Sequence, residues 1–182
     1  MIVGKRVRLR AVERADIALY HEWLNDAEVT EGLARYLPFS MADEERWFEN
    51  MSQREEEQRP LAIEILDGQE WKLAGNTGLF NLEWTNRSAE LGIFIGDKSK
   101  WNQGYGTEAL GLILQHGFNT LNLNRIFLRV YASNSRAQRS YEKAGFKLEG
   151  TMRQALFRHG QYVDVNIMSI LRSEWKELPE GK

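Results

Sequence analysis

A glycine-rich turn between a strand pattern and a helix pattern constrains the fold of this chain more than any other segment. It reads WNQGYGTEAL from Trp101 to Leu110, and it follows an alternating apolar run over residues 91–95. The first N–H groups of a helix have no partner within the helix, and the helix dipole adds partial positive charge there. Gly104 and Gly106 let the backbone approach an anion without obstruction by a Cβ atom. The segment therefore predicts a site for a phosphate group.

The remaining patterns predict a single α+β domain that spans residues 1–182. Alternating or bounded apolar runs predict strands over residues 7–11, 61–66, 73–84, 89–95, 125–131, 146–149 and 163–171. Cap residues and helical spacing predict helices after Asp16, from Ser40 to Met51, and over residues 107–121 and 134–144. The segment from Glu28 to Pro38 has no regular pattern. Gly145 stands where a left-handed helix cap is expected, and His159-Gly160 predicts the last turn.

Composition excludes several classes of site and partner. The 182 residues carry a net charge of −2, which is too small to predict a nucleic-acid or membrane partner. The chain has no cysteine, which excludes a disulfide, a thiolate zinc site and a thiol nucleophile. Its histidines, His21, His116 and His159, have no metal-ligand spacing, so no metal site is predicted. Residues 1–10 lack a signal-peptide pattern and no apolar run approaches about 20 residues, which predicts a cytoplasmic location.

Three phosphate-bearing ligands suit a glycine-rich helix start, and the flanking residues help to separate them. A nucleotide P-loop requires Lys-Ser or Lys-Thr after its second glycine, whereas Thr-Glu follows Gly106. A dinucleotide fingerprint matches the Gly-x-Gly-x-x-Ala spacing that starts at Gly104. Its glycines normally follow the strand directly, whereas here they come eight or more residues after Ile95, and no acid follows Tyr131 to bind a ribose. That alternative rests on spacing alone, and acyl-coenzyme A is the third ligand.

Three motifs support acyl-coenzyme A, because they occur in the order and at the separations of one enzyme family. Trp101-x-x-Gly104-x-Gly106 corresponds to the family's pyrophosphate loop, Arg/Gln-x-x-Gly-x-Gly/Ala, with an aromatic residue in the first place. A second motif spans residues 134–146 (N-x-x-A-x-x-x-Y-x-K-x-G-F), and a third spans residues 149–164. Each motif alone is weak evidence, whereas all three in order are strong. The chain resembles the GNAT acetyltransferase superfamily over nearly its whole length, specifically the RimJ/RimL and spermidine-acetyltransferase-like branch.

The resemblance implies a central twisted, mostly antiparallel sheet of about seven strands, with one parallel splayed pair and about four flanking helices. It maps the splayed strands onto residues 90–96 and 125–131, with the pantetheine arm of acetyl-CoA between them. Backbone amides near the end of the first of these strands would hold the acyl carbonyl. The residues that the resemblance places against acetyl-CoA are Phe94, Ile95, Trp101, Asn102, Gln103, Gly104, Tyr105, Gly106, Thr107, Asn134 and Arg139.

The implied chemistry is a direct attack of a neutral amine on the thioester, without a covalent enzyme intermediate. Tyr141 occupies the tyrosine place of the second motif and is the candidate acid for the departing thiolate. Glu90 is the candidate base, because a carboxylate beside apolar strands can have a raised pKa. It could equally be a structural carboxylate bound to an arginine such as Arg87. Asn134 is a favoured helix cap and, by the resemblance, also a cofactor contact.

Recognition of the acceptor is the least constrained part of the interpretation. In the family this pocket is built from the first two helices, their loop and the last hairpin, which offers Glu31, Tyr36 and Tyr162. The resemblance implies an N-acetyltransferase that acts on a protein N-terminus, a polyamine, or a small amine metabolite or antibiotic. The alternative is a non-catalytic acyl-CoA-binding or sensor protein on the same fold. The branch often forms dimers, so a homodimer is a further expectation.

Overall fold

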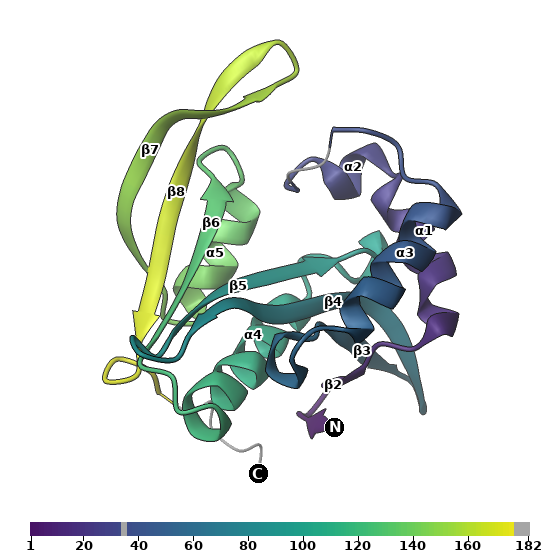
Figure 1. Cartoon of the computed structure of the whole chain (residues 1–182), viewed down its shortest axis with the longest axis horizontal. Coiled ribbons are helices and arrows are strands. Elements are labelled where there is room, and N and C mark those ends of the chain that lie inside the picture. Colours follow the sequence, from purple (N-terminus) through teal and green to yellow (C-terminus); the bar gives the residue numbers. More distant parts are fainter. Residues whose placement is uncertain (34–35, 177–182) are drawn as a thin grey trace.

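Eight strands form one twisted sheet that extends through the molecule (Figure 1). The computed structural model describes residues 1–33 and 36–176. The strands are β1 (Ile2–Val3), β2 (Val7–Ala11), β3 (Leu61–Asp67), β4 (Glu70–Glu83), β5 (Ser88–Ile95), β6 (Arg125–Tyr131), β7 (Lys147–Arg158) and β8 (Gln161–Leu171). The helices are α1 (Ile17–Leu24), α2 (Ala27–Thr30), α3 (Met41–Ser52), α4 (Tyr105–Gln115) and α5 (Ser135–Lys143). Shorter helical turns are η1 (Arg14–Asp16), η2 (Glu56–Gln58), η3 (Lys98–Lys100) and η4 (His116–Thr120).

The strand order places one parallel pair in the interior of the sheet. The order is β1-β2-β3-β4-β5-β6-β8-β7, and all neighbours are antiparallel except β5 and β6. The parallel contact has three residue pairs and ends at Glu90 and Phe127. Both strands continue beyond this point, over residues 91–95 and 128–131, which are described throughout and are not paired with each other. The expected mostly antiparallel sheet with a splayed parallel pair is therefore confirmed.

Two helical layers cover opposite faces of this sheet. On one face, α4 and α5 place Ile113 and Tyr141 in the main core together with Ile63 of β3. On the other face, Tyr20 of α1 joins a second cluster that includes Ala62 of β3, with α3 beside it. Neighbouring residues of a strand point to opposite faces, so Ala62 and Ile63 mark the two sides of the sheet. The apolar side chains of β3 and β5 are therefore covered on both faces of the sheet.

Local cap signals place the helices as the sequence predicts. The Ser40 hydroxyl accepts a hydrogen bond from the Asp43 N–H (3.2 Å) at the start of α3. At the end of α5, Gly145 has φ of 99°, and the Phe146 N–H donates to the Tyr141 carbonyl (3.0 Å). A glycine takes this left-handed conformation without a steric penalty, which fixes the turn from α5 into β7.

The last hairpin differs most from the sequence prediction. The prediction of a short strand over residues 146–149 was wrong in length, because β7 extends from Lys147 to Arg158. β7 is an edge strand of the sheet and most of its residues are exposed, so no alternation of apolar and polar residues marks its length. The turn lies at His159 and Gly160 as predicted, with φ of 48° and 79°. Figure 1 shows β7 and β8 as a long curved arm beside α5.

Smaller differences lie near the N-terminus and at the end of α4. β1 is an additional strand, and α2 overlaps the start of the segment that was expected to be irregular. The predicted cap at Asp16 is replaced by η1, since the Asp16 carboxylate instead accepts from the Glu13 N–H (2.8 Å) and from Arg10. The expected helix over residues 107–121 is α4 followed by the π-helical turn η4. None of these differences changes the position of the splayed strands.

Candidate active site

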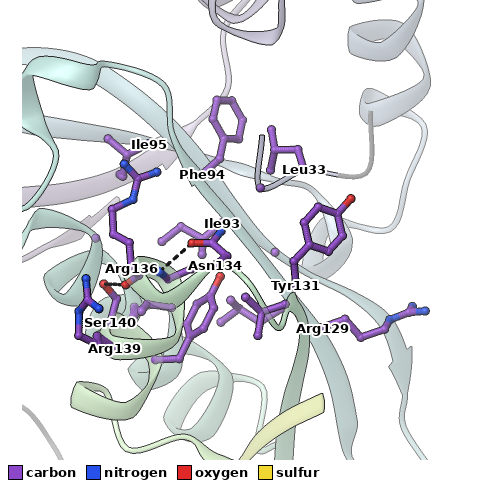
Figure 2. A pocket seen from close by; sticks show the side chains of 18 of the residues that line it. Leu33, Ile93, Phe94, Ile95, Arg129, Tyr131, Asn134, Arg136, Arg139 and Ser140 are labelled. Carbon is purple, nitrogen blue, oxygen red and sulfur yellow. Dashed lines mark hydrogen bonds between the residues drawn. The ribbon is translucent and has the colours of Figure 1, made fainter. Parts of the chain in front are cut away.

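A cavity of about 650 Å³ fills the space where β5 and β6 separate. It extends from the start of α4, along the unpaired parts of both strands, to the middle of β7 and the end of α2. Figure 2 shows that side chains from β5, β6, α5 and the segment around Leu33 surround this space. The splay thus brings together residues that lie far apart in the sequence.

Most of the residues predicted for acetyl-CoA and catalysis line this one cavity. They are Glu90, Phe94, Ile95, Trp101, Asn102, Gly104, Tyr105, Gly106, Thr107, Asn134, Arg139 and Tyr141. Gln103 lies beside them in the loop, where its carbonyl accepts from Arg6 (3.3 Å), but it is not among the lining residues. The predicted acceptor residues Glu31, Tyr36 and Tyr162 lie outside the lining.

Trp101 attaches the glycine-rich loop to the end of β5. Its indole Nε1–H donates a hydrogen bond to the Ile95 carbonyl (2.8 Å). The guanidinium of Arg136 lies over the indole ring, 3.6 Å from the ring centroid, and Figure 2 shows this side chain extending from α5 toward Ile95. Such a stack combines a cation with an aromatic face. The aromatic residue in the first place of the loop therefore also brings a cation to the loop.

Gly104 sets the geometry of the loop where it enters α4. It has φ of 85° and occupies the N-cap position of the helix, a backbone conformation that favours glycine. Its conformation turns the chain so that α4 begins at Tyr105, with its first N–H groups at the cavity. This arrangement has the geometry that a helix-start anion site requires, and the anion site itself stays a prediction.

Positive side chains also line the cavity, most of them on α5 or on the turn before α4. The cationic lining residues are Lys100, Arg129, Arg136, Arg139 and Lys143. All but Arg129 belong to the loop before α4 or to α5. Burial lowers the pKa of Arg136, and the nearby Glu28 opposes that shift. A helix start next to several cations is chemically suited to the phosphate groups of coenzyme A.

Asn134 performs the predicted cap of α5 at the edge of the cavity. Its side-chain oxygen accepts a hydrogen bond from the Ala137 N–H (3.1 Å). The backbone of Gly32 lies close to its amide nitrogen, because a Cβ atom on Gly32 would be 2.5 Å from Nδ2. Asn134 therefore joins the start of α5 to the segment that follows α2.

Tyr141 lies on α5 with its ring largely enclosed. Its exposed fraction is 9%, and its ring packs edge-on against Phe146 at 5.9 Å between centroids. Burial raises the pKa of Tyr141 to about 12. The phenol is therefore protonated at neutral pH, which is the state that a proton donor requires.

Glu90 lies where the parallel pair of strands ends, and both of its oxygens are engaged. Arg129 of β6 donates to Oε1 through Nε and to Oε2 through Nη2, each at 2.8 Å, and Asn81 donates to Oε2 (3.1 Å). Glu90 is buried, whereas the Arg129 side chain is 53% exposed and its guanidinium points away from the centre of the cavity in Figure 2. The arginine partner is thus Arg129 and not Arg87. Two-point contact of this kind joins β5 to β6 just before they separate.

The far end of the cavity is mainly apolar. Its lining residues from α2 and the segment after it, and from β4, β7 and β8, include Val29, Leu33, Phe80, Met152, Leu156 and Val165. Of the three predicted acceptor residues, Glu31 contacts His159 at 3.3 Å, and Tyr162 packs on Phe157 at 5.1 Å between centroids. Tyr36 is 61% exposed. The sequence did not indicate Met152 or Leu156, because β7 was expected to end before them.

Two further properties concern metals and membranes. Within residues 1–33 and 36–176, no cluster of three or more histidine, aspartate or glutamate side chains is arranged to hold a metal ion. In the same residues, no helix is both long and apolar enough to cross a membrane.

Comparison with known proteins identifies the family. Residues 6–147 match the family described as acetyltransferase (GNAT) domain. The spermidine N(1)-acetyltransferase of Vibrio cholerae serotype O1 is 30% identical over 173 residues, which are 95% of this chain and 97% of that protein. The enzyme of the same name from Escherichia coli K12 is 30% identical over 172 residues, 93% of this chain and 88% of that protein.

A solved structure agrees with these relationships. The crystal structure of spermidine N-acetyltransferase from Vibrio cholerae in complex with CoA and spermine has a TM-score of 0.84 and 29% identity. It covers 93% of this chain and 97% of that chain. The similarity in sequence and in structure thus extends over the splayed strands, the glycine-rich loop and α5. The chain belongs to the GNAT acetyltransferase family, whose members transfer an acetyl group from acetyl-CoA to a primary amine.

Proposed function

We propose that this enzyme transfers the acetyl group directly, in a ternary complex, with acetyl-CoA lying between β5 and β6. One observation carries the proposal: the unpaired stretches of the two strands connect the cationic start of α4 to Tyr141 within a single cavity. Backbone groups that lack a strand partner can pair with the pantetheine arm, and the N–H groups at the start of α4 suit its pyrophosphate. The cavity volume of about 650 Å³ is within the usual range for a cofactor site.

In this proposal Tyr141 donates the proton that the departing thiolate requires. It lines the cavity, and its raised pKa keeps the phenol protonated. The reaction then needs no nucleophile from the protein, which agrees with the absence of cysteine. The neutral acceptor amine attacks the thioester carbonyl, and backbone N–H groups near Phe94 and Ile95 stabilise the oxyanion. The attacking nitrogen then loses its extra proton to solvent water, and the C–S bond breaks as Tyr141 protonates the departing thiolate.

The contacts of Glu90 support its structural role over its role as a base. Both oxygens of the Glu90 carboxylate already accept hydrogen bonds from Arg129 and Asn81, which is the arrangement of a carboxylate in a structural ion pair. We therefore assign Glu90 to holding the two strands together at the point where they begin to separate.

Spermidine and spermine are the first acceptors to test. Two relatives that match more than nine-tenths of this chain are named for spermidine, and the similar solved structure contains spermine.

The cavity lining itself favours a second class of acceptor amine. Among the lining residues that the structure describes, Glu90 is the one acid, it is already paired, and the far end of the cavity is apolar. An amine carried on an apolar group is the acceptor that matches this lining. A homodimer and a cytoplasmic location remain predictions.

The first experiment is a thiol-release assay with acetyl-CoA and a panel of amines. The panel holds spermidine, spermine, phenethylamine, free amino acids, aminoglycosides and peptides with varied N-termini. We expect turnover with at least one class, and the ratio of kcat/KM values for spermidine and phenethylamine decides between the two leading candidates. Binding of acetyl-CoA without turnover of any amine would favour the non-catalytic sensor.

The Tyr141→Phe variant tests the proposed acid. We expect kcat to fall about 100-fold, because general acid catalysis contributes roughly that much, while the affinity for acetyl-CoA changes less than about twofold. Tyr162→Phe is the matched control, since Tyr162 is an exposed tyrosine outside the cavity lining. Equal activity of Tyr141→Phe and wild type would exclude the acid role.

A further inference from the structure

The tip of the last hairpin contacts the end of α2 through Arg158, the last residue of β7. One guanidinium nitrogen, Nη2, donates to the carbonyl of Thr30 (2.7 Å), and the other, Nη1, donates to the carbonyl of Leu33. The two carbonyls belong to residues at the end of α2 and just after it, and 125 or more positions in sequence separate them from Arg158. The contact therefore connects the last hairpin, near the C-terminal end of the chain, to the segment at the end of α2.

The Arg158 guanidinium is held by neutral acceptors. It lies over the ring of Tyr131, 5.6 Å from the ring centroid, and Nη1 is 3.4 Å from the Tyr131 hydroxyl oxygen. Its Nε atom is buried and has no hydrogen-bond partner among the described residues. A planar guanidinium presents two N–H groups side by side and can connect two carbonyls, whereas an ammonium group is a single flexible point charge. This site is thus specific for arginine.

The segment that Arg158 holds forms one wall of the cavity. Val29 and Leu33 are lining residues, and so is Gly32, whose backbone lies against the Asn134 side chain. Tyr131 at the end of β6, which Arg158 also contacts, lines the cavity beside this segment. Arg158 itself is not among the lining residues. It therefore connects two neighbouring parts of the cavity lining, the segment after α2 and the end of β6, without lining the cavity itself.

We infer that Arg158 is a positioning residue for the acceptor amine: it holds the Thr30–Leu33 segment against Tyr131 and so defines the acceptor end of the cavity. This inference rests on the proposed function, because it assigns the far end of the cavity to the acceptor. Loss of the contact releases the wall that carries Val29 and Leu33, whereas the start of α4 and the glycine-rich loop keep their own contacts. The effect falls on the acceptor and not on acetyl-CoA.

Steady-state kinetics of Arg158→Met and Arg158→Lys test the inference. For Arg158→Met we expect the KM for the acceptor to rise about tenfold, with the KM for acetyl-CoA within about twofold of wild type. Arg158→Lys retains the positive charge, and its ammonium group can donate to one of the two carbonyls, so we expect an intermediate KM for the acceptor. The control is His159→Asn, which removes the neighbouring contact with Glu31 and keeps a residue type that tolerates the positive φ at this position.

Hydrogen exchange measured by mass spectrometry on residues 27–33 gives a readout that needs no acceptor. The Leu33 N–H donates to the Thr30 carbonyl (3.0 Å), which also accepts from Arg158, so exchange in this segment reports on the contact. We expect exchange at least about fivefold faster in Arg158→Met and unchanged in His159→Asn. Circular dichroism shows whether each variant folds. If Arg158→Met does not fold, the exchange and KM values of Arg158→Lys test the inference.

The two measurements separate failure of the inference from failure of the proposed function. Unchanged exchange in both Arg158 variants overturns the inference. Faster exchange with an unchanged KM for the acceptor, or an equal rise in both KM values, also overturns it, since the contact would then be structural only. Absence of turnover by the wild-type enzyme with every amine contradicts the proposed function and the acceptor role together, while the exchange data still establish whether Arg158 holds the segment.

Discussion

Burial of the Tyr141 phenol determines the pH range over which this residue can donate a proton. A donor must be protonated, and the pKa of about 12 keeps Tyr141 protonated well above neutral pH. At pH 9 only about one phenol in a thousand is ionised at such a pKa. We therefore expect kcat to rise as the acceptor amine loses its proton and then to stay level up to about pH 10.

The measurement is kcat against pH from 6 to 10 at saturating acetyl-CoA, with wild type and Tyr141→Phe. A decline of the wild-type rate centred near pH 8 to 9 that is absent from the phenylalanine variant would contradict the expectation. Such a result would mean that the bound substrates lower the pKa of Tyr141 into the working range.

Glu90→Gln separates a base from a structural carboxylate. Glutamine keeps the shape and one acceptor oxygen but removes the charge opposite Arg129. We expect the free energy of unfolding to fall by about 1–2 kcal/mol, because Arg129 is half exposed and its unpaired charge can be hydrated. We expect kcat to fall less than about fivefold. Urea unfolding and steady-state kinetics of the same variant provide both numbers. A loss of about 100-fold or more in kcat with little change in stability would restore Glu90 as the base.

At the scale of single elements, the start of α4 offers a test of the phosphate site. Gly104 has φ of 85°, and Gly160 at the hairpin turn has a nearly equal φ of 79°. Replacement of either glycine by alanine imposes a similar backbone strain of about 1 kcal/mol. We expect Gly104→Ala to weaken acetyl-CoA binding about tenfold or more, because the strain shifts the N–H groups at the helix start, and Gly160→Ala to leave it unchanged. Calorimetric titration with acetyl-CoA measures both. Equal affinities in the two variants would exclude this helix start as the pyrophosphate site.

The elements that the sequence predicts well are those with a local signal. Ser40, Asn134 and Gly145 mark helix ends through their own side chains or lack of one, and each lies where it was expected. β6 was predicted at its observed bounds, because its apolar positions alternate. β7 was not, because an exposed edge strand needs no such alternation. Because the predicted strand ended at residue 149, the sequence indicated neither Met152 as a lining residue nor the contact of Arg158.

At the scale of the whole molecule, the site depends on contacts that no local pattern records. The splay of β5 and β6 is a property of the sheet, and it was expected only from the family resemblance. An arginine partner for Glu90 was one of the alternatives, with Arg87 as the example because it is near in sequence. The arginine is instead Arg129, which approaches through the parallel pairing of two strands. The candidate acceptor residues Glu31, Tyr36 and Tyr162 lie outside the cavity lining. Glu31 directly precedes the lining residue Gly32, but its carboxylate contacts His159 at the hairpin tip.

The sheet consists of two parts that meet through few strand contacts. β1 to β5 form one part and β6, β8 and β7 form the other, with three residue pairs between β5 and β6. A ligand between the strands adds contacts to both parts, so it should stabilise the whole molecule. At acetyl-CoA concentrations about 100 times the Kd, the added stability is roughly 2.7 kcal/mol. We expect the unfolding temperature to rise by roughly 5–10 °C.

Hydrogen exchange locates that stabilisation. Acetyl-CoA should slow exchange in residues 91–95 of β5 and in residues 128–131 of β6, because both segments lack a strand partner on the side of the gap. The pairing of β2 with β3, on the far side of β4, is the internal control and should show a smaller change. Protection limited to the start of α4, with β6 unchanged, would place the cofactor outside the gap. Protection of both strands together would mean that acetyl-CoA completes the connection between the two parts of the sheet, so that the acceptor meets a cavity whose opposite walls are already fixed.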